Sequence, residues 1–215
     1  MAKKKKWLIR KVNKLKAILN SLRKKEGTMP NNALTAISEI AAFGSNDLKG
    51  YATNYLNRIN AVGEQLEFYI KDAVAGSFKL PLSQKPGHYA KIFSYLGNQN
   101  NPPDMIIKNG DAFEIKKIES PFASLALNSS PPKDVLRHSD NRITTACRNC
   151  ESAPWKEKEL FYVIGNPTKG ILKYLFFIQG TCYAASHDVY DKVHEPLKKE
   201  IDSTLDSLNL EKAKT

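Results

Sequence analysis

Apolar residues recur at helical spacing in several stretches of the chain, and each stretch predicts a helix. The first runs from Leu8 to Leu22 at spacings of 4, 3, 4 and 3, with Lys and Arg on its other faces. Further helices are predicted over residues 31–56 with a break at 44–46, over 55–75 with Gly76 as C-terminal cap, and over 187–208. Ser139 or Asp140 can cap another helix that runs to about Cys150.

Runs of β-branched and aromatic residues separate these helices and predict strands. Residues 104–108 and 111–118 form a candidate hairpin, with a continuation over 122–127 after a break at Pro121. Residues 159–164 and 171–179 follow, and residues 128–133 have the composition of a polar loop. This order predicts an α/β fold around a central mixed sheet flanked by helices. It consists of a single domain over 26–215 behind a basic helical arm of residues 1–25.

The positive charge of the protein is concentrated in that arm. The chain holds 33 Lys and Arg against 22 Asp and Glu, and eleven of the basic residues lie in residues 1–25, which contain no acid. A balanced body with a basic helix fits a protein that holds a polyanion such as DNA, because neutralising phosphates releases counterions. A solvated, solubilising tail is the alternative. A helix on a membrane surface ranks below DNA, since a single aromatic lies near the apolar stripe.

Composition indicates the cellular compartment of the protein and the state of its cysteines. No apolar stretch approaches the roughly 20 residues of a membrane span, so we expect a cytoplasmic protein without membrane contact. Three cysteines without a secretion signal argue against a disulfide framework. Cys147 and Cys150 form a CxxC pair that could join histidines elsewhere in a zinc site. Reduced structural thiols are the simpler interpretation.

The hairpin carries the candidate chemistry, and its register decides whether its carboxylates can cooperate. A two-residue loop at Asn109-Gly110 would turn Glu114 away from Asp104. A three-residue loop with Gly110 in the left-handed conformation would place Asp104 opposite Glu114. We predict the second arrangement, in which both carboxylates and Lys116 share one face of the hairpin.

Two carboxylates and a lysine on one face are the groups that a metal-dependent nuclease uses. Mg²⁺ prefers oxygen ligands, so Asp104, Glu114 and the main-chain carbonyl of Ile115 are predicted to bind it. Lys116 is predicted to orient or deprotonate the water that attacks the phosphate in line, which leaves a 5′ phosphate. Glu67, in the preceding predicted helix, is a candidate third carboxylate, with a solvated glutamate as the alternative. An exposed strand edge with alternating charges would give the same pattern without catalysis.

Three stretches extend the pattern beyond the hairpin. They are Gly110-Asp-Ala-Phe-Glu-Ile-Lys-Lys-Ile-Glu-Ser120, Ala123-Ser-Leu-Ala-Leu-Asn-Ser-Ser130 and Thr145-Ala-Cys-Arg-Asn-Cys150. Together they resemble the NgoPII-type family of type II restriction endonucleases, and the similarity covers most of residues 55–185. The stretch Ser-Leu-Ala-Leu-Asn-Ser-Ser is specific to that family. The first 25 residues have no place in the family pattern.

The resemblance implies the PD-(D/E)xK nuclease fold, Mg²⁺ dependence, a homodimer and cleavage of the palindrome GGCC in double-stranded DNA. A two-fold dimer matches a palindrome because each subunit cuts one strand. It also implies a cognate DNA methyltransferase that acts on the same site without forming a stable complex. Carried over to this chain, the catalytic set is Asp104, Glu114 and Lys116. Only nine residues separate the first two, which makes Asp111 a possible substitute for Asp104.

Side chains that contact DNA are predicted around this core. Lys117 and Ser120 follow the catalytic strand and are expected to bind phosphate. The candidate base readers, each of which can equally contact phosphate, are Asn128, Ser129, Ser130, Lys133, Arg137, Asn141, Arg142 and Arg148. Two other functions stay open, namely a non-enzymatic nucleic-acid-binding protein and a PD-(D/E)xK repair nuclease that acts on DNA structure.

Overall fold

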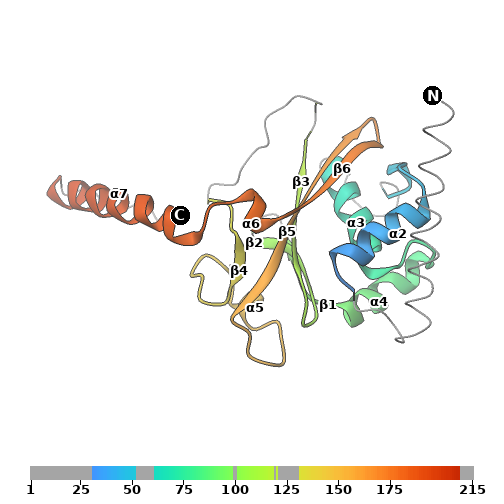
Figure 1. Ribbon diagram of the computed structural model, residues 1–215, viewed down its shortest axis with the longest axis horizontal. Helices are drawn as coiled ribbons and strands as arrows, with labels where there is room; N and C mark the ends of the chain where they lie inside the picture. Colours follow the sequence, from blue (N-terminus) through green and yellow to red (C-terminus); the bar gives the residue numbers. More distant parts are fainter. Residues whose placement is uncertain (1–30, 52–60, 99–100, 119, 121–130, 209–215) are drawn as a thin grey trace.

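A mixed β-sheet flanked by helices forms the body of the protein in the computed structural model (Figure 1), which describes residues 31–51, 61–98, 101–118, 120 and 131–208. The strands are β1 (Phe93–Asn98), β2 (Asn101–Ile107), β3 (Ala112–Lys117), β4 (Val135–Arg137), β5 (Glu157–Thr168) and β6 (Ile171–Gln179). The helices are α2 (Ala33–Phe43), α3 (Ala61–Ala75), α4 (Lys85–Ile92), α5 (Thr145–Arg148), α6 (Gly180–Tyr183) and α7 (His187–Ser207), with short 3₁₀ turns at Lys49–Tyr51 and Leu82–Gln84.

The sheet has the strand order β1-β2-β3-β5-β4, and β6 pairs with the same strand β5 as β4 does. Strands β3 and β5 are parallel, whereas the other described pairs are antiparallel. The predicted α/β fold around a mixed sheet is therefore confirmed. In the part of the chain that the structure describes, no helix is long and apolar enough to cross a membrane.

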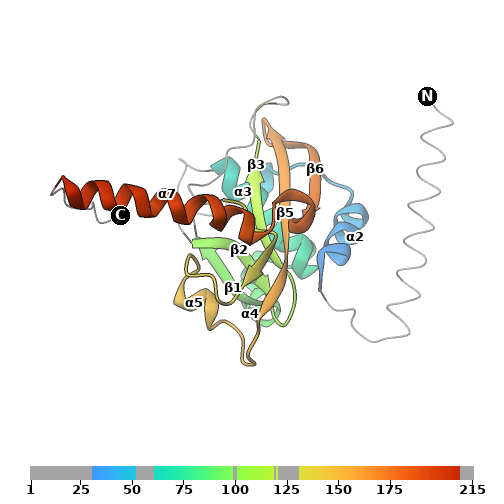
Figure 2. The ribbon, with the colours of Figure 1, turned by 60° about the vertical axis from the view of Figure 1, so that its left-hand side comes forward.

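Two apolar layers hold the sheet. On the face covered by α2, α3 and α4 (Figures 1 and 2), Leu66, Tyr69 and Ile70 of α3 pack into one buried cluster with Met105, Phe113 and Val163 of the central strands. On the opposite face a smaller cluster joins Ile106, Leu160 and Ile164 to Leu136 and Cys147 from the β4 and α5 region. This second layer covers only part of its face, and the catalytic candidates lie beside it.

The helix ends and strands mostly follow the predicted pattern. Gly76 closes α3 in the left-handed conformation, as expected, and α7 matches its prediction. Residues 165–168, which lie outside the predicted strands 159–164 and 171–179, continue strand β5, because Thr168 pairs with Ile171 and Lys169 and Gly170 form the turn. Both turn residues have positive φ, which is typical of a tight two-residue hairpin turn.

The prediction of a helix that begins at Ser139 or Asp140 is wrong. The Asp140 carboxylate accepts hydrogen bonds from the main-chain N–H and the guanidinium of Arg142, and it thereby closes a loop. Helix α5 begins later and is shorter, with the Thr144 hydroxyl as its N-cap acceptor for the Cys147 N–H. Strands β1 and β4 and helix α4 were not predicted, because their segments lack a clear apolar period.

Several predictions fall outside the described residues. The basic helical arm of residues 1–25, its boundary with the body, and the strand continuation over 122–127 all belong to this group. The same holds for the base-reading candidates Asn128, Ser129 and Ser130.

Candidate active site

The β2–β3 hairpin brings the two candidate carboxylates together. Met105 pairs with Phe113 and Ile106 with Ala112, and the same register places Asp104 opposite Glu114. The regular pairing of β2 with β3 ends at Met105, and beyond it the Asp104 carboxylate accepts the main-chain N–H of Ile115 at 2.5 Å. The predicted register is confirmed, and an aspartate side chain takes the place of a main-chain partner at the point where the two strands part.

The loop has the predicted length, but the prediction that Gly110 has positive φ is wrong. The Gly110 N–H donates to the Ile107 carbonyl at 2.9 Å, and Asn109 has a φ of 55°. The Asn109 N–H donates to Glu151, whose carboxylate also accepts from Lys158, and these contacts hold the turn against the β5 side of the sheet. Asn tolerates the left-handed conformation, so the same register is reached without Gly110 adopting it.

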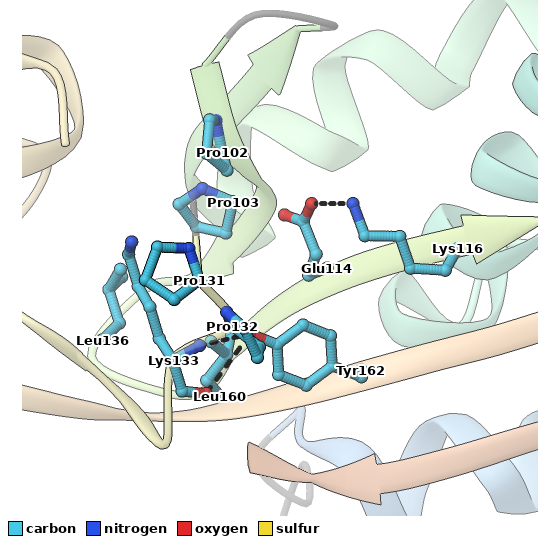
Figure 3. Close-up of a pocket in the computed structure, with 10 residues that line it drawn as sticks. All are labelled: Pro102, Pro103, Glu114, Lys116, Pro131, Pro132, Lys133, Leu136, Leu160 and Tyr162. Carbon is cyan, nitrogen blue, oxygen red and sulfur yellow. Dashed lines mark hydrogen bonds and ion pairs between the residues drawn. The ribbon is translucent and has the colours of Figure 1, made fainter. Parts of the chain in front are cut away.

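Glu114 and Lys116 face each other on the sheet face that α2, α3 and α4 leave open. The Lys116 ammonium donates to the Glu114 carboxylate at 2.7 Å, and Glu114 is only 7% exposed. Figure 3 shows the two groups pointing toward one another at a hollow that is also lined by Lys133, Tyr162 and a set of prolines, Pro102, Pro103, Pro131 and Pro132. The alternation of β3 thus presents a carboxylate and a cation at one pocket.

Asp104 lies close to two other carboxylates, those of Glu114 and Glu67. Burial, then the charge of Glu114 and then that of Glu67 raise its pKa to about 7, against the lowering effects of the Ile115 N–H and of Lys116. Glu67 reaches this site from α3, where it accepts a hydrogen bond from Lys71 at 2.6 Å. The structure therefore brings the candidate third carboxylate within electrostatic reach of Asp104.

This pKa makes the stability of the metal-free protein depend on pH. Between the ordinary value of 3.8 and about 7, the folded chain holds a proton on Asp104 that the unfolded chain releases. Raising the pH through this window therefore lowers the free energy of unfolding. We expect Asp104→Asn to flatten that decline, as measured by urea unfolding with EDTA at about pH 5 and about pH 8. An unchanged slope in the variant would show that Asp104 is not the group responsible.

The donor set fits a hard divalent cation held partly by water. Among the described residues, no three His, Cys, Asp or Glu side chains form a ready metal cage. Asp104 and Glu114 instead offer two carboxylates on adjacent strands, next to the main chain of Ile115. Mg²⁺ characteristically binds through one or two carboxylates and keeps several waters. A cation here would also relieve the repulsion that raises the pKa of Asp104.

The predicted substitute for Asp104 has another role. The Asp111 carboxylate accepts the main-chain N–H of Ala33 at 3.2 Å, at the first turn of α2. A carboxylate at a helix N-terminus satisfies an otherwise unbonded N–H and suits the helix dipole. This contact assigns Asp111 to the packing of α2 on the hairpin.

Some DNA-contact candidates are engaged within the protein. Arg137 binds Asp134 through two nitrogens at 2.7 and 3.0 Å, and Arg142 binds Asp140. Arg148 donates to the carbonyls of His138 and Asp140, so it braces the loop before α5.

The remaining DNA-contact candidates lie closer to the active site or at the surface. Lys133 lines the hollow beside Glu114 and reaches Asp140 at 3.1 Å. Lys117 ends β3, while Ser120 and Asn141 are exposed. These are the described candidates best placed to contact DNA.

Three further side chains belong to the same region and were not predicted. Burial raises the pKa of Tyr162, whose hydroxyl accepts the Lys133 N–H at the floor of the hollow. Lys71 is buried against Glu67. Phe176, more than half exposed, lies on β6 opposite Ile164, which itself pairs with Lys116. The alternation of β6 could have identified Phe176 as a residue of this region from the sequence. The positions of Tyr162 and Lys71 follow only from the tertiary structure.

The cysteines are free thiols. Cys147 is buried in the second apolar layer, and the Cys150 sulfur accepts a weak hydrogen bond from Ser94 at 3.6 Å. His138 packs its ring edge-on against Trp155. The described residues hold no group of three or more metal-binding side chains, and the interpretation of CxxC as structural thiols stays a prediction.

Comparison with known proteins agrees with this geometry. The model of the NgoPII restriction endonuclease family matches residues 31–215. The type II restriction enzyme NgoPII of Neisseria gonorrhoeae is 45% identical over 146 residues, which are 67% of this chain and 52% of that relative. The match thus spans about half the length of the curated relative, and no solved structure matches. Because the family match covers most of the chain, the protein belongs to the NgoPII restriction endonuclease family.

Proposed function

We propose that this protein is a type II restriction endonuclease that hydrolyses phosphodiester bonds in double-stranded DNA. The observation that carries the proposal is the convergence of Asp104, Glu114 and Lys116 on the open face of a splayed hairpin. The 45% identical relative, a type II restriction enzyme, supports the same activity. We further propose GGCC as the target, by resemblance to the family.

Each side chain has a separate role in the proposed reaction. Asp104, Glu114 and the carbonyl of Ile115 would hold Mg²⁺, which when bound activates water and offsets charge on the phosphate. Lys116, now paired with Glu114, donates to the attacking water or to a phosphate oxygen as negative charge develops. Glu67, anchored by Lys71 and within electrostatic reach of Asp104, would add a third carboxylate to the site. Expulsion of the 3′ oxygen leaves a 5′ phosphate on the product.

A palindromic target calls for two copies of this site. A two-fold homodimer presents the same hollow to both strands, so each subunit makes one cut. Lys117, Ser120, Lys133 and Asn141 are the described residues that we assign to contacts with the flanking DNA, mainly to phosphates. A cognate methyltransferase would protect the same sequence without binding this protein stably.

Digestion of a plasmid of known sequence tests activity, specificity and cut position together. We expect cutting in Mg²⁺, no cutting in EDTA, and sequenced ends that all fall within GGCC and carry 5′ phosphates. Ends without a common sequence would favour a nuclease that acts on DNA structure. Binding of DNA without any Mg²⁺-dependent cutting would refute the nuclease and favour a non-enzymatic binding protein.

A further inference from the structure

The C-terminal helix α7 has an apolar stripe that nothing in the described protein covers. None of its 21 residues is buried. Val189, Val193, Leu197 and Ile201 are each 50% to 60% exposed. In Figures 1 and 2 the helix leaves the body near its N-terminal end and extends into the open. Apolar side chains in an unbroken row of this length mark a surface that binds another protein surface.

We propose that α7 is the dimerisation element and that its occupant is α7 of a second copy, packed antiparallel. The apolar residues recur every four positions, at 189, 193, 197, 201 and 205. Residues four apart form one ridge on a helix, and such ridges interlock between crossing helices. The spacing alone therefore describes a helix that packs against another helix of similar length.

The stripe is symmetric about Leu197, which points to a copy of itself as the partner. Val193 and Ile201 are equally distant from Leu197, as are Val189 and Leu205. A two-fold axis at Leu197 then sets Val193 against Ile201 of the partner subunit and Leu197 against its own copy, whereas Val189 and Leu205, each rotated by about 80° from Leu197, lie at the margins. A C₂ interface requires this self-complementarity, because the same patch must serve both sides.

The charges beside the stripe favour the antiparallel direction. Lys192 directly precedes Val193, and Glu200 directly precedes Ile201. In an antiparallel pair centred on Leu197, Lys192 lies near Glu200 of the partner subunit. A parallel pair would instead set each lysine beside its own copy, and like charges at matched positions are destabilising.

Among the described residues, the hydrogen bonds that tie α7 to the body lie at its N-terminal end. The Tyr190 hydroxyl accepts the main-chain N–H of Ala185, and His187 lies 3.4 Å from the Arg142 guanidinium. These contacts set the direction in which the helix leaves the body, and they leave the remaining turns open to a partner. The inference rests on the proposed function only in its need for two copies, and its test uses no cleavage assay.

The first test is the mass of the full chain in solution by light scattering. Wild type is expected at twice the chain mass of 24.1 kDa, and Leu197→Glu at the mass of a single chain. Ser203→Glu is the matched control, because it adds the same charge to α7 away from the stripe and should leave the dimer intact. Circular dichroism confirms that each variant keeps its fold. A dimer that persists in Leu197→Glu would overturn the proposal.

Disulfide crosslinking tests the direction of packing and does not depend on that variant. In a Cys182→Ser background, which removes the exposed thiol, Leu197→Cys is expected to crosslink to itself under mild oxidation. Val193→Cys should crosslink when mixed with Ile201→Cys and not when alone. Crosslinking of Val193→Cys to itself would indicate parallel helices, and no crosslinking at any position would indicate another occupant for the stripe. Either result overturns the antiparallel pair. Repeating the measurement in Glu114→Gln separates it from activity, because a catalytically dead dimer should crosslink equally well.

Discussion

Replacing Glu114 with Gln is expected to reduce the rate of DNA cleavage by about 10³-fold while leaving DNA binding nearly unchanged. The amide keeps the volume of a side chain that is only 7% exposed, so the fold should persist. It removes the negative charge that would bind the metal and that now holds the Lys116 ammonium at 2.7 Å. Lys116→Met should cause a loss of about 10²- to 10⁴-fold, since it removes the donor to the water and the phosphate. Single-turnover cleavage and gel-shift binding of the same duplex measure the two effects separately.

Controls on neighbouring strands show whether the effect is local. Glu159→Gln on β5 and Lys173→Met on β6 make the same chemical changes at exposed positions, and both should cleave at nearly the wild-type rate. If Glu114→Gln cleaves as fast as these controls, the hairpin carboxylates are not the catalytic groups. Loss of binding together with cleavage would indicate that Glu114 serves the fold, and unfolding measurements would then show a lower stability.

Replacing Asp72 with Ala is expected to lower the free energy of unfolding by about 3–5 kcal/mol. Asp72 lies fully buried on α3, where its carboxylate binds the Lys85 ammonium and accepts hydrogen bonds from Ser77 and Tyr89 at 2.6 and 2.7 Å. The substitution leaves a buried lysine without its counter-charge, together with two hydroxyls without their acceptor. Urea unfolding at neutral pH measures the loss.

An exposed ion pair is the matched control for that experiment. Arg137 and Glu157 also form an ion pair, at 3.2 Å, but the Glu157 side chain is 58% exposed. Glu157→Ala should therefore cost less than about 1 kcal/mol. A similarly small cost for Asp72→Ala would mean that Lys85 finds another partner or water. The buried pair matters for function as well, because Asp72 and Glu67 lie on the same helix and α4 holds that helix in place through Lys85 and Tyr89.

The local pattern of the chain was sufficient for the elements that carry their own period. The alternation around Phe113 and the helical stripe from Leu66 to Val74 predicted the hairpin and α3, and both pack as the pattern requires. The register of the hairpin was also predictable, because loop length and alternation allow only a few pairings. The left-handed residue was not predictable, since it depends on Glu151, before β5, and on Lys158, on β5, which lie 42 and 48 residues from their partners in the turn.

Side-chain roles that depend on distant partners could not be predicted in the same way. Arg148 and Asp111 carry charges that suit DNA or a metal, yet one braces a loop and the other caps α2. Polar side chains form whichever contacts the fold makes available, and composition does not distinguish these contacts from those with a ligand.

By itself the sequence determined the α/β class, the hairpin with its carboxylates and lysine on one face, and the amphipathic helix at the C-terminal end. These follow from periodicity, which depends only on backbone geometry and on burial of apolar surface. The tertiary structure alone decided that Glu67 approaches Asp104, that Asp111 instead contacts the start of α2, and that no described residue covers the stripe of α7. Each of these depends on where elements far apart in sequence pack, and the local pattern of a segment does not specify the partner against which it packs.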